Sequence, residues 1–368
     1  MPKIGVVFPP NRPPYELCYL SDLNKVSARA ILDESAQPVG EYPNVECVFP
    51  GRRRSAIPAS LQRRVVSPVQ YNAEEVHLKD VDAIVSIELY SFTTNRMIQL
   101  AEKQGVKSFV FSWETLAKHP LYLVPPFAAY ARKAIRASDG FIGATDRAVR
   151  HLQVLGADRT KVERVYPGVD TEIFKPGSRT EQEPARVILY VGLLAEHKGF
   201  DLVLRLFQNL RKSDERLQLW VVGDGPLRYL MSMDMGKNVR YFGHLPRSQL
   251  PEVYSGATVF VTLPRVARSF GIKTWEEQFG FTLAEAMSTG LPVVSTDCGA
   301  VRELAGNDNP IVKEGDLDSA IKAARILLED SQRASDIGIR NRQRIRGTFD
   351  AKTQSREFEA FLVSRLNG

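Results

Sequence analysis

Cysteine is scarce in this sequence and long hydrophobic runs are missing, and each absence excludes a class of protein. The three cysteines, Cys18, Cys47 and Cys298, are odd in number and none lies in a CxxC pair. We therefore expect reduced, mostly structural thiols, and neither a disulfide framework nor a zinc site. No stretch approaches the roughly 18–20 uninterrupted apolar residues of a membrane-spanning helix. The first residues, MPKIGVVFPPNRPP, lack the apolar core of a signal peptide, so a cytoplasmic protein is expected.

No glycine-rich loop follows the first expected strand, Lys3–Phe8, although many nucleotide sites carry one at that point. Prolines occupy the turn instead, at Pro9, Pro10, Pro13 and Pro14. Because only glycine lets the backbone approach a phosphate closely, we do not expect this turn to hold a phosphate.

Acidic residues are absent from one stretch of an otherwise evenly charged chain. The net charge of +6 is diffuse over 368 residues, but residues 47–73 hold five arginines and no acid. Two interpretations stay open: a solvated loop, or a contact of residues 51–66 with anionic lipid head groups at the inner membrane face or with a phosphate-bearing acceptor. No aromatic residues alternate with these arginines and no recognition motif accompanies them, so nucleic-acid binding is not expected.

Strands and helices alternate in both halves of the chain, which predicts two parallel sheets in an α/β fold. A chain of 368 residues suits two such domains, at roughly 150 residues per domain, and two domains imply a cleft. The polar segment Pro176–Pro184 interrupts the pattern. We expect an N-terminal domain at 1–172, a C-terminal domain at 173–348 and a final helical segment at 349–368. The expected strands and helices are Lys3–Phe8, Ala83–Ile87, Thr94–Gln104 (helix), Ser108–Phe111, Gly140–Gly143, Arg186–Val191, Phe200–Leu210 (helix), Leu217–Val222, Val239–Phe242, Ala257–Thr262, Pro292–Ser295 and Ala351–Leu366 (helix).

Two glutamates in the segment WEEQFGFTLAEAMSTG, residues 275–290, carry the densest chemical signal. Glu277 and Glu285 are eight residues apart, with an FGF turn between them and a helix expected from about Thr282. The N–H groups of the turn and of the first helical residues can hold a diphosphate without a metal ion, and Gly280 permits a positive φ there. The alternative is that both acids are ordinary first-turn carboxylates of a surface helix.

A lysine follows the strand Arg186–Val191 in the segment GLLAEHKG, residues 192–199. Carboxylates alone would repel a diphosphate, so Lys198 is the expected counter-charge. Gly192, the first residue of the segment, is expected among the donor-binding residues. The alternative is a surface lysine that happens to precede a helix.

These segments together resemble a known family. In this order, GLLAEHKG, GDGPLR at 223–228, EQFGFTLAEAMSTGLPVVST and GAVREL at 299–304 look like the C-terminal domain of family 4 retaining glycosyltransferases, the group 1 type with the GT-B architecture. This family contains sucrose synthases and phosphatidylinositol mannosyltransferases. The resemblance covers residues 140–345 well, and VYPGVDTEIFKP at 165–176 looks like the family's crossing between domains.

The resemblance implies two Rossmann-like domains that face each other across a cleft, with the C-terminal helix crossing back to the N-terminal domain. It implies that Glu277 contacts the donor sugar, Glu285 the ribose, and the N–H groups of Phe281 and Thr282 the diphosphate, with Gly223 near the nucleotide. The implied activity is retaining, metal-independent hexosyl transfer from a UDP- or GDP-sugar to a glycan, lipid-linked or small-molecule acceptor, with Glu277 and Lys198 as catalytic residues and no cofactor. Two alternatives stay open: a catalytically inactive sugar-nucleotide-binding protein, and a sugar-nucleotide epimerase.

The sequence departs from the family's pattern at two places. The family usually has a phosphate-binding arginine two residues into the lysine motif, where this chain has Leu193, and we expect Arg265 or Arg268 to supply the missing contact.

The second departure is in the N-terminal domain, where a family histidine often lines the sugar pocket and this chain reads FSWETLAKHP. Trp113, Glu114 and His119 are therefore candidates for an acceptor or sugar pocket. Glu114 has a helix-cap alternative and His119 a local structural one.

One acidic motif has no expected site role. Asp316-Leu317-Asp318 has the D-x-D form of metal-dependent transferases but lies in a polar turn, where a helix cap is expected instead. The GDG at residues 223–225 lacks the third glycine of a dinucleotide loop and is expected to form the turn after a strand. Neither motif supports a metal ion or NAD.

Overall fold

The computed structural model describes residues 1–8, 18–32, 42, 44–49, 52–53, 70–71, 78, 80–116, 119–177, 186–232 and 238–367. The proline turn after the first strand lies outside the described residues. So does the segment 51–66 proposed to contact a membrane, except for the backbone of Arg52 and Arg53. The three cysteines are free thiols, as the sequence predicts.

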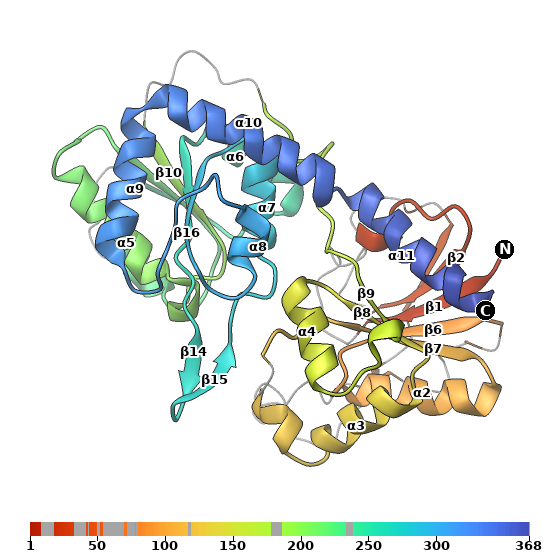
Figure 1. The fold of residues 1–368 in the computed structure, drawn as a ribbon. Coiled ribbons are helices and arrows are strands. Elements are labelled where there is room, and N and C mark those ends of the chain that lie inside the picture. The colour runs from red at the N-terminus through yellow and green to blue at the C-terminus, as the bar shows by residue number, and fades with distance from the viewer. Residues whose placement is uncertain are drawn as a thin grey trace. The chain divides into compact units, whose positions relative to one another are not determined.

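The chain divides into two compact units, residues 1–168 with 351–368 as unit 1, and Val169–Asp350 as unit 2. Each unit is built on its own sheet of parallel strands (Figure 1). No helix among the described ranges is long and apolar enough to cross a bilayer.

Unit 1 has a seven-stranded sheet in the order β3-β2-β1-β6-β7-β8-β9, and all its strand pairs are parallel. Every residue of β6 is buried, as expected for a strand that is covered on both faces. Helices α2 and α3 lie on one face of the sheet and α11 lies on the other (Figure 1). The strands are β1 (Lys3–Val7), β2 (Ser27–Ile31), β3 (Val45–Val48), β6 (Ala83–Ile87), β7 (Lys107–Ser112), β8 (Gly140–Gly143) and β9 (Val162–Arg164). The helices are α2 (Phe92–Gln104), η2 (Pro120–Leu123), α3 (Phe127–Ala137), α4 (Asp146–Val154), η3 (Arg159–Lys161) and α11 (Ala351–Leu366), and β4 (Arg52–Arg53) pairs with β5 (Gln70–Tyr71).

The C-terminal helix α11 belongs to unit 1, which confirms the expectation that it returns to the N-terminal domain. Its Phe361 meets the ring of Phe109 on β7, with ring centroids 5.7 Å apart. Its buried Glu359 accepts backbone N–H groups from Asn24, Lys25 and Val26, just before β2. Apolar packing and a satisfied carboxylate therefore both fix this helix to the sheet.

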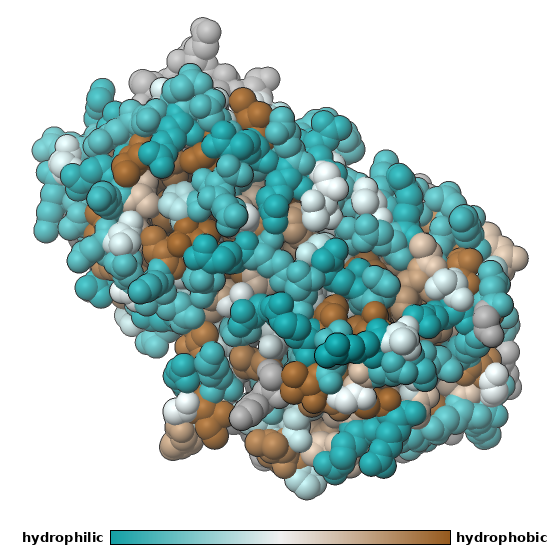
Figure 2. Space-filling model, in the orientation of Figure 1, coloured by the Kyte–Doolittle hydropathy of each residue, from teal (hydrophilic) through white to brown (hydrophobic). Residues whose placement is uncertain are grey.

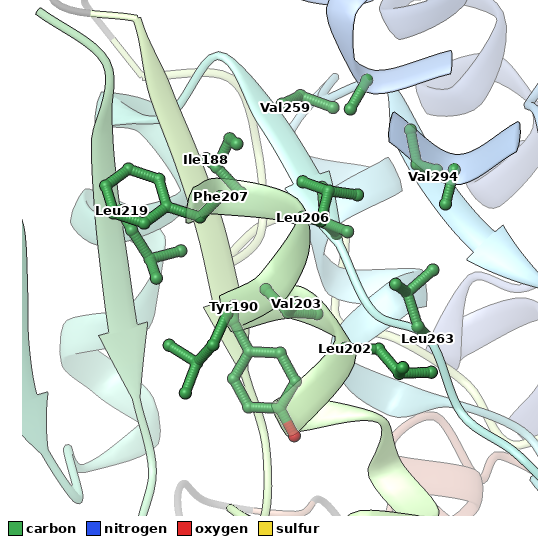
Figure 3. Close-up of a cluster of buried hydrophobic side chains, with 14 of the residues drawn as sticks. Ile188, Tyr190, Leu202, Val203, Leu206, Phe207, Leu219, Val259, Leu263 and Val294 are labelled. Atoms are coloured by element: carbon green, nitrogen blue, oxygen red, sulfur yellow. The ribbon is translucent and has the colours of Figure 1, made fainter. Parts of the chain in front are cut away.

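Unit 2 has a six-stranded sheet in the order β12-β11-β10-β13-β16-β17, again with parallel pairs throughout. Its core gathers side chains of β10, β11, β13 and β16 against α5, including Ile188, Leu206 and Phe207 (Figure 3). The strands are β10 (Val187–Val191), β11 (Gln218–Val222), β12 (Val239–Gly243), β13 (Val259–Val261), β16 (Val293–Thr296) and β17 (Ile311–Val312). The helices are η4 (Glu196–Lys198), α5 (Phe200–Arg211), η5 (Arg228–Ser232), η6 (Arg247–Gln249), α6 (Leu250–Gly256), α7 (Phe281–Ser288), α8 (Val301–Ala305), α9 (Leu317–Glu329) and α10 (Ser331–Thr348).

Unit 2 also contains a capped acidic turn and a hairpin outside its sheet. The carboxylate of Asp316 accepts the N–H of Ser319 and caps α9, which confirms that the D-x-D segment is a helix cap. An antiparallel hairpin of β14 (Ala267–Ser269) and β15 (Ile272–Trp275) stands apart from the parallel sheet, and it was not among the elements expected from the sequence.

Candidate functional site

Lys198 and Glu277 come together in unit 2, although 79 residues separate them. Lys198 ends the short helix η4 after β10, and Glu277 lies on the loop between β15 and α7. The Lys198 Nζ donates to Glu277 Oε2 at 2.8 Å, and the two side chains are 26% and 14% exposed. The pair is therefore partly shielded yet open to solvent, which is a suitable position for binding a charged ligand.

The loop that carries Lys198 is held by Arg265. The backbone N–H of Arg265 donates to the carbonyl of His197, and its Nε donates to the carbonyl of Glu196. Its Nη2 reaches both carboxylate oxygens of Asp201, at 2.8 and 2.9 Å. The guanidinium thus fixes the backbone just before Lys198.

Trp275, at the end of β15, also contacts this loop. The Lys198 ammonium lies 4.5 Å from the centre of the Trp275 ring, and the ring of His197 meets the same indole edge to face at 4.6 Å. Burial lowers the pKa of His197, and the neighbouring Lys198 lowers it further. These contacts limit the movement of the lysine toward solvent.

The backbone of Glu277 is held by the turn that follows β16. The Ala300 N–H donates to the Glu277 carbonyl at 2.8 Å. Gly299 has φ of +58°, and a Cβ at this position would lie 2.0 Å from the Glu277 carbonyl oxygen. The GAVREL segment therefore positions Glu277, and this role was not expected from the sequence, in which Gly299 was the one available signal.

Helix α7 begins directly after Glu277 and its turn. Gly280 caps the helix with φ of +94°, in the left-handed region that glycine tolerates. Phe281 and Thr282 are its first residues. The first N–H groups of a helix have no carbonyl partner within the helix and carry a partial positive charge, so this end of α7 favours an anion.

Glu285 lies inside α7 and is 3% exposed. Its Oε1 accepts from Arg247 Nε at 3.0 Å, and its Oε2 accepts from the Tyr254 hydroxyl at 3.1 Å. Burial raises the pKa of Glu285, while Arg247 and the hydroxyl oppose that rise. The expected contact of Glu285 with ribose stays a prediction.

Gly192 and Gly223 end adjacent strands, β10 and β11. The Gly192 N–H donates to the Val222 carbonyl, and a Cβ on Gly223 would lie 1.9 Å from the Gly192 carbonyl oxygen. Glycine at 223 therefore allows the two strand ends to approach each other closely. Leu193, which stands where the family has arginine, is 46% exposed.

Neither arginine expected to replace the family's phosphate contact has a demonstrated ligand. Arg265 already donates to Glu196 and Asp201. Arg268, on the exposed strand β14, donates to the Gly271 carbonyl at 3.3 Å. Phosphate binding by either residue stays a prediction.

The three candidates in unit 1 follow β7. Trp113 is buried, and its backbone N–H donates to Glu88 Oε1 at 2.9 Å. Buried Glu114 accepts the N–H groups of Thr115 and Leu116, which stabilises its own turn.

His119 caps the short helix η2, because its Nδ1 accepts the Leu121 N–H at 3.3 Å. It also stacks on Tyr90, with ring centroids 6.0 Å apart. The contacts of His119 are those of a local structural residue, whereas no helix begins at the Thr115 and Leu116 N–H groups that Glu114 accepts. An acceptor role for the three residues stays a prediction.

Glu88 was not found from the sequence. It has φ of +68° and is 2% exposed. It accepts from the Ser112 hydroxyl at 3.2 Å as well as from Trp113. A positive φ at a buried glutamate is uncommon, and no sequence pattern marks it.

Histidine, cysteine, aspartate and glutamate side chains form no group of three able to hold a metal ion within the described ranges.

A comparison with protein families matches residues 171–344 to the glycosyl transferases group 1. Sulfoquinovosyl transferase of Arabidopsis thaliana is 25% identical over 63% of this chain and 44% of its own length. The GDP-mannose-dependent alpha-(1-6)-phosphatidylinositol monomannoside mannosyltransferase of Mycolicibacterium smegmatis is 28% identical over 55% of this chain and 56% of its own length. The chain thus spans about half the length of these curated relatives.

Solved structures resemble the whole chain. Anabaena HepE in complex with UDP has a TM-score of 0.73 at 15% identity, over 99% of this chain and 100% of that one. Sucrose-phosphate synthase of Thermosynechococcus elongatus has a TM-score of 0.73 at 15% identity, over 99% of both chains. This likeness confirms the expected fold of two Rossmann-like domains, the GT-B class. Residues 171–344 of this chain are therefore similar to the glycosyl transferases group 1 family.

Proposed function

We propose that the protein is a retaining, metal-independent glycosyltransferase that takes a hexose from a UDP- or GDP-sugar. The observation that carries this proposal is the contact of Lys198 with Glu277, 2.8 Å long, beside the N-terminus of α7. A cation, a carboxylate and a set of helix N–H groups at one place suit the two ends of a nucleotide-diphosphate sugar, which are an anionic diphosphate and a hydroxylated ring.

In the proposed reaction, Lys198 and the α7 N-terminus stabilise the negative charge that develops on the leaving diphosphate. Electrostatic stabilisation of this kind is commonly the largest contribution to catalysis. The bond from C1 to the phosphate oxygen breaks, and the acceptor oxygen bonds to C1 on the same face. The acceptor proton goes to the departing phosphate oxygen, so no protein base is required.

Glu277 orients the sugar hydroxyls and stabilises the positive charge on the ring in the transition state. Two contacts support this role: the Gly299 turn holds the backbone of Glu277, and Lys198 donates to its carboxylate. Glu285, inside α7, accepts a hydrogen bond from a ribose hydroxyl. The hydroxyl either replaces Arg247 as the donor to Oε1 or uses a lone pair of the carboxylate that Arg247 leaves open.

The choice of donor and acceptor rests on the relatives. One relative is named as GDP-mannose-dependent and one similar structure holds UDP, so we propose UDP- or GDP-sugars. The relatives' names mention a phosphatidylinositol mannoside and inositol 3-phosphate. We therefore propose a lipid-linked, glycan or small polyol acceptor, with the enzyme acting at the cytoplasmic face.

A second candidate is a catalytically inactive sugar-nucleotide-binding protein. Leu193, 46% exposed in place of the family's phosphate-binding arginine, favours it. Release of free nucleotide from a donor sugar by the purified protein would contradict this candidate.

The test compares wild type with Glu277→Ala and with Glu252→Ala, an exposed acid on α6 that serves as the control. Donor turnover is measured by nucleotide release over a panel of UDP- and GDP-sugars, and the anomeric configuration of the product by NMR. We expect the transfer rate of Glu277→Ala to fall about a hundredfold or more and that of Glu252→Ala to match wild type. The product should keep the anomeric configuration of the donor. Near-wild-type turnover of Glu277→Ala, or an inverted product, would contradict the proposal.

A further inference from the structure

The hairpin β14–β15 projects from the sheet of unit 2 and ends in a two-residue turn, Phe270–Gly271 (Figure 1). Both turn residues have positive φ, +49° at Phe270 and +79° at Gly271. Hairpin turns of this kind favour asparagine and glycine, and a bulky residue at positive φ is costly. A phenylalanine at the tip therefore does not serve the stability of the turn.

The tip is apolar and fully open to solvent. Phe270 is 102% exposed and Ile272 is 53% exposed. Figure 2 shows hydrophobic residues at the end of this projection. Exposed side chains of this size, placed together on a narrow projection, suggest insertion into an apolar environment.

The charge next to the tip is of one sign. Arg268 on β14 and Lys273 on β15 are direct cross-strand partners in the hairpin register. Like charges directly opposite each other destabilise a strand pair unless an anion lies near them. Residues 265–275 contain no acid. The hairpin thus combines an apolar tip with a pair of cations that favours an anionic partner.

The base of the hairpin is joined to the Lys198 loop. Arg265, just before β14, holds the carbonyl groups of Glu196 and His197, and Trp275, at the end of β15, contacts Lys198. Five residues of extended strand place the tip about 17 Å from Trp275. A surface that captures the tip therefore holds the site at a short, fixed distance.

We propose that the tip inserts into the head-group region of an anionic lipid bilayer, with Phe270 and Ile272 among the acyl chains and Arg268 and Lys273 on lipid phosphates. Cationic segments with aromatic or aliphatic side chains bind bilayers in this way. A free phosphate would leave the apolar tip in water, and an acidic protein surface offers no comparable depth of hydrocarbon. One consequence of this contact rests on the proposed function: the acceptor would be a lipid, and its head group would reach the site at the membrane surface.

The experiment is sedimentation of the full chain with vesicles of phosphatidylcholine alone or with equal parts of phosphatidylglycerol. The variant Phe270→Ser/Ile272→Ser is compared with Tyr229→Ser/Ile339→Ser, whose side chains are 61% and 55% exposed elsewhere in unit 2. We expect the hairpin variant to bind the anionic vesicles about tenfold or more weakly, and the control to match wild type. Lys273→Gln should weaken binding about fivefold at low salt.

A second readout reports insertion directly. In Phe270→Trp, the added indole should shift its emission to shorter wavelength with anionic vesicles. Equal binding of both double variants, or equal binding to the two vesicle types, would overturn the inference. The inference would also be overturned if nucleotide alone, or an acidic protein alone, produced the same emission shift without vesicles.

Donor turnover with a water-soluble acceptor, measured in parallel, separates the two proposals. Vesicle binding without any turnover would refute the proposed enzyme and leave the membrane contact standing. Turnover without vesicle binding would refute the membrane contact alone.

Discussion

Gly299→Ala tests whether the backbone behind Glu277 sets the geometry of the site. The Cβ of the alanine would lie 2.0 Å from the Glu277 carbonyl oxygen, whereas real Cβ contacts are essentially never under 3.0 Å. The Glu277 loop must therefore move by about 1 Å, and a displacement of that size can reduce a rate about a hundredfold. The left-handed backbone, with φ of +58°, adds a strain of about 1–2 kcal/mol for a residue with a Cβ.

Gly315→Ala is the matched control for that prediction. Gly315 also has a positive φ, +80°, but a Cβ there would meet nothing within 4 Å. It carries the backbone strain without the clash, so we expect a smaller loss of stability than in Gly299→Ala, about 1 kcal/mol, and unchanged turnover. The assay is kcat/KM for donor turnover, with the thermal midpoint of each variant measured beside it. Equal activity of the two variants would refute the argument that the Gly299 turn positions Glu277.

Three further predictions concern groups around the site and in unit 1. Arg247→Met leaves Glu285 buried without its cation, so urea denaturation at neutral pH should show a loss of about 3–5 kcal/mol; an unchanged midpoint would mean that the contact contributes nothing. Asp201→Ala removes the carboxylate that holds Arg265, and kcat/KM for the donor should fall about tenfold through a looser lysine loop; unchanged kinetics would exclude this role. Burial lowers the pKa of His151 from 6.5 to about 4, so the unfolded chain binds a proton first as the pH falls. The contribution of His151 to the free energy of unfolding is complete above pH 6.5, and up to about 3 kcal/mol is lost toward pH 4. Thermal unfolding of His151→Leu should lack this loss. A pH profile identical to that of wild type would refute the prediction.

Much of the fold could be predicted from the alternation of strands and helices along the chain. The expected strand Ser108–Phe111 is Lys107–Ser112 in the structure, and the expected helix Thr94–Gln104 is Phe92–Gln104. The hairpin β14–β15 could not be predicted, because its turn has phenylalanine where turn residues are expected and its strands are three and four residues long.

The candidate site was predictable only where residues lie in local motifs. The glutamate pair and Lys198 stand in short patterned segments, and the structure brings Lys198 to Glu277. Arg247 and Tyr254 could not be predicted because they reach Glu285 from the segment between β12 and β13, 38 and 31 residues away in the sequence. No sequence pattern marks either residue. Long-range pairing of this kind depends on the packing of the elements, which spacing alone does not determine.

The measurement that tests the central claim most directly is calorimetric binding in EDTA of a nucleotide sugar and of the matching free nucleotide diphosphate. The donor for this titration is the one that turns over in the panel. The proposed roles predict that wild type binds both ligands without metal, that Lys198→Ala weakens both, and that Glu277→Ala keeps its affinity for the nucleotide but loses the added affinity for the sugar. Full sugar-nucleotide affinity in both variants, or binding that requires a divalent ion, would contradict the account.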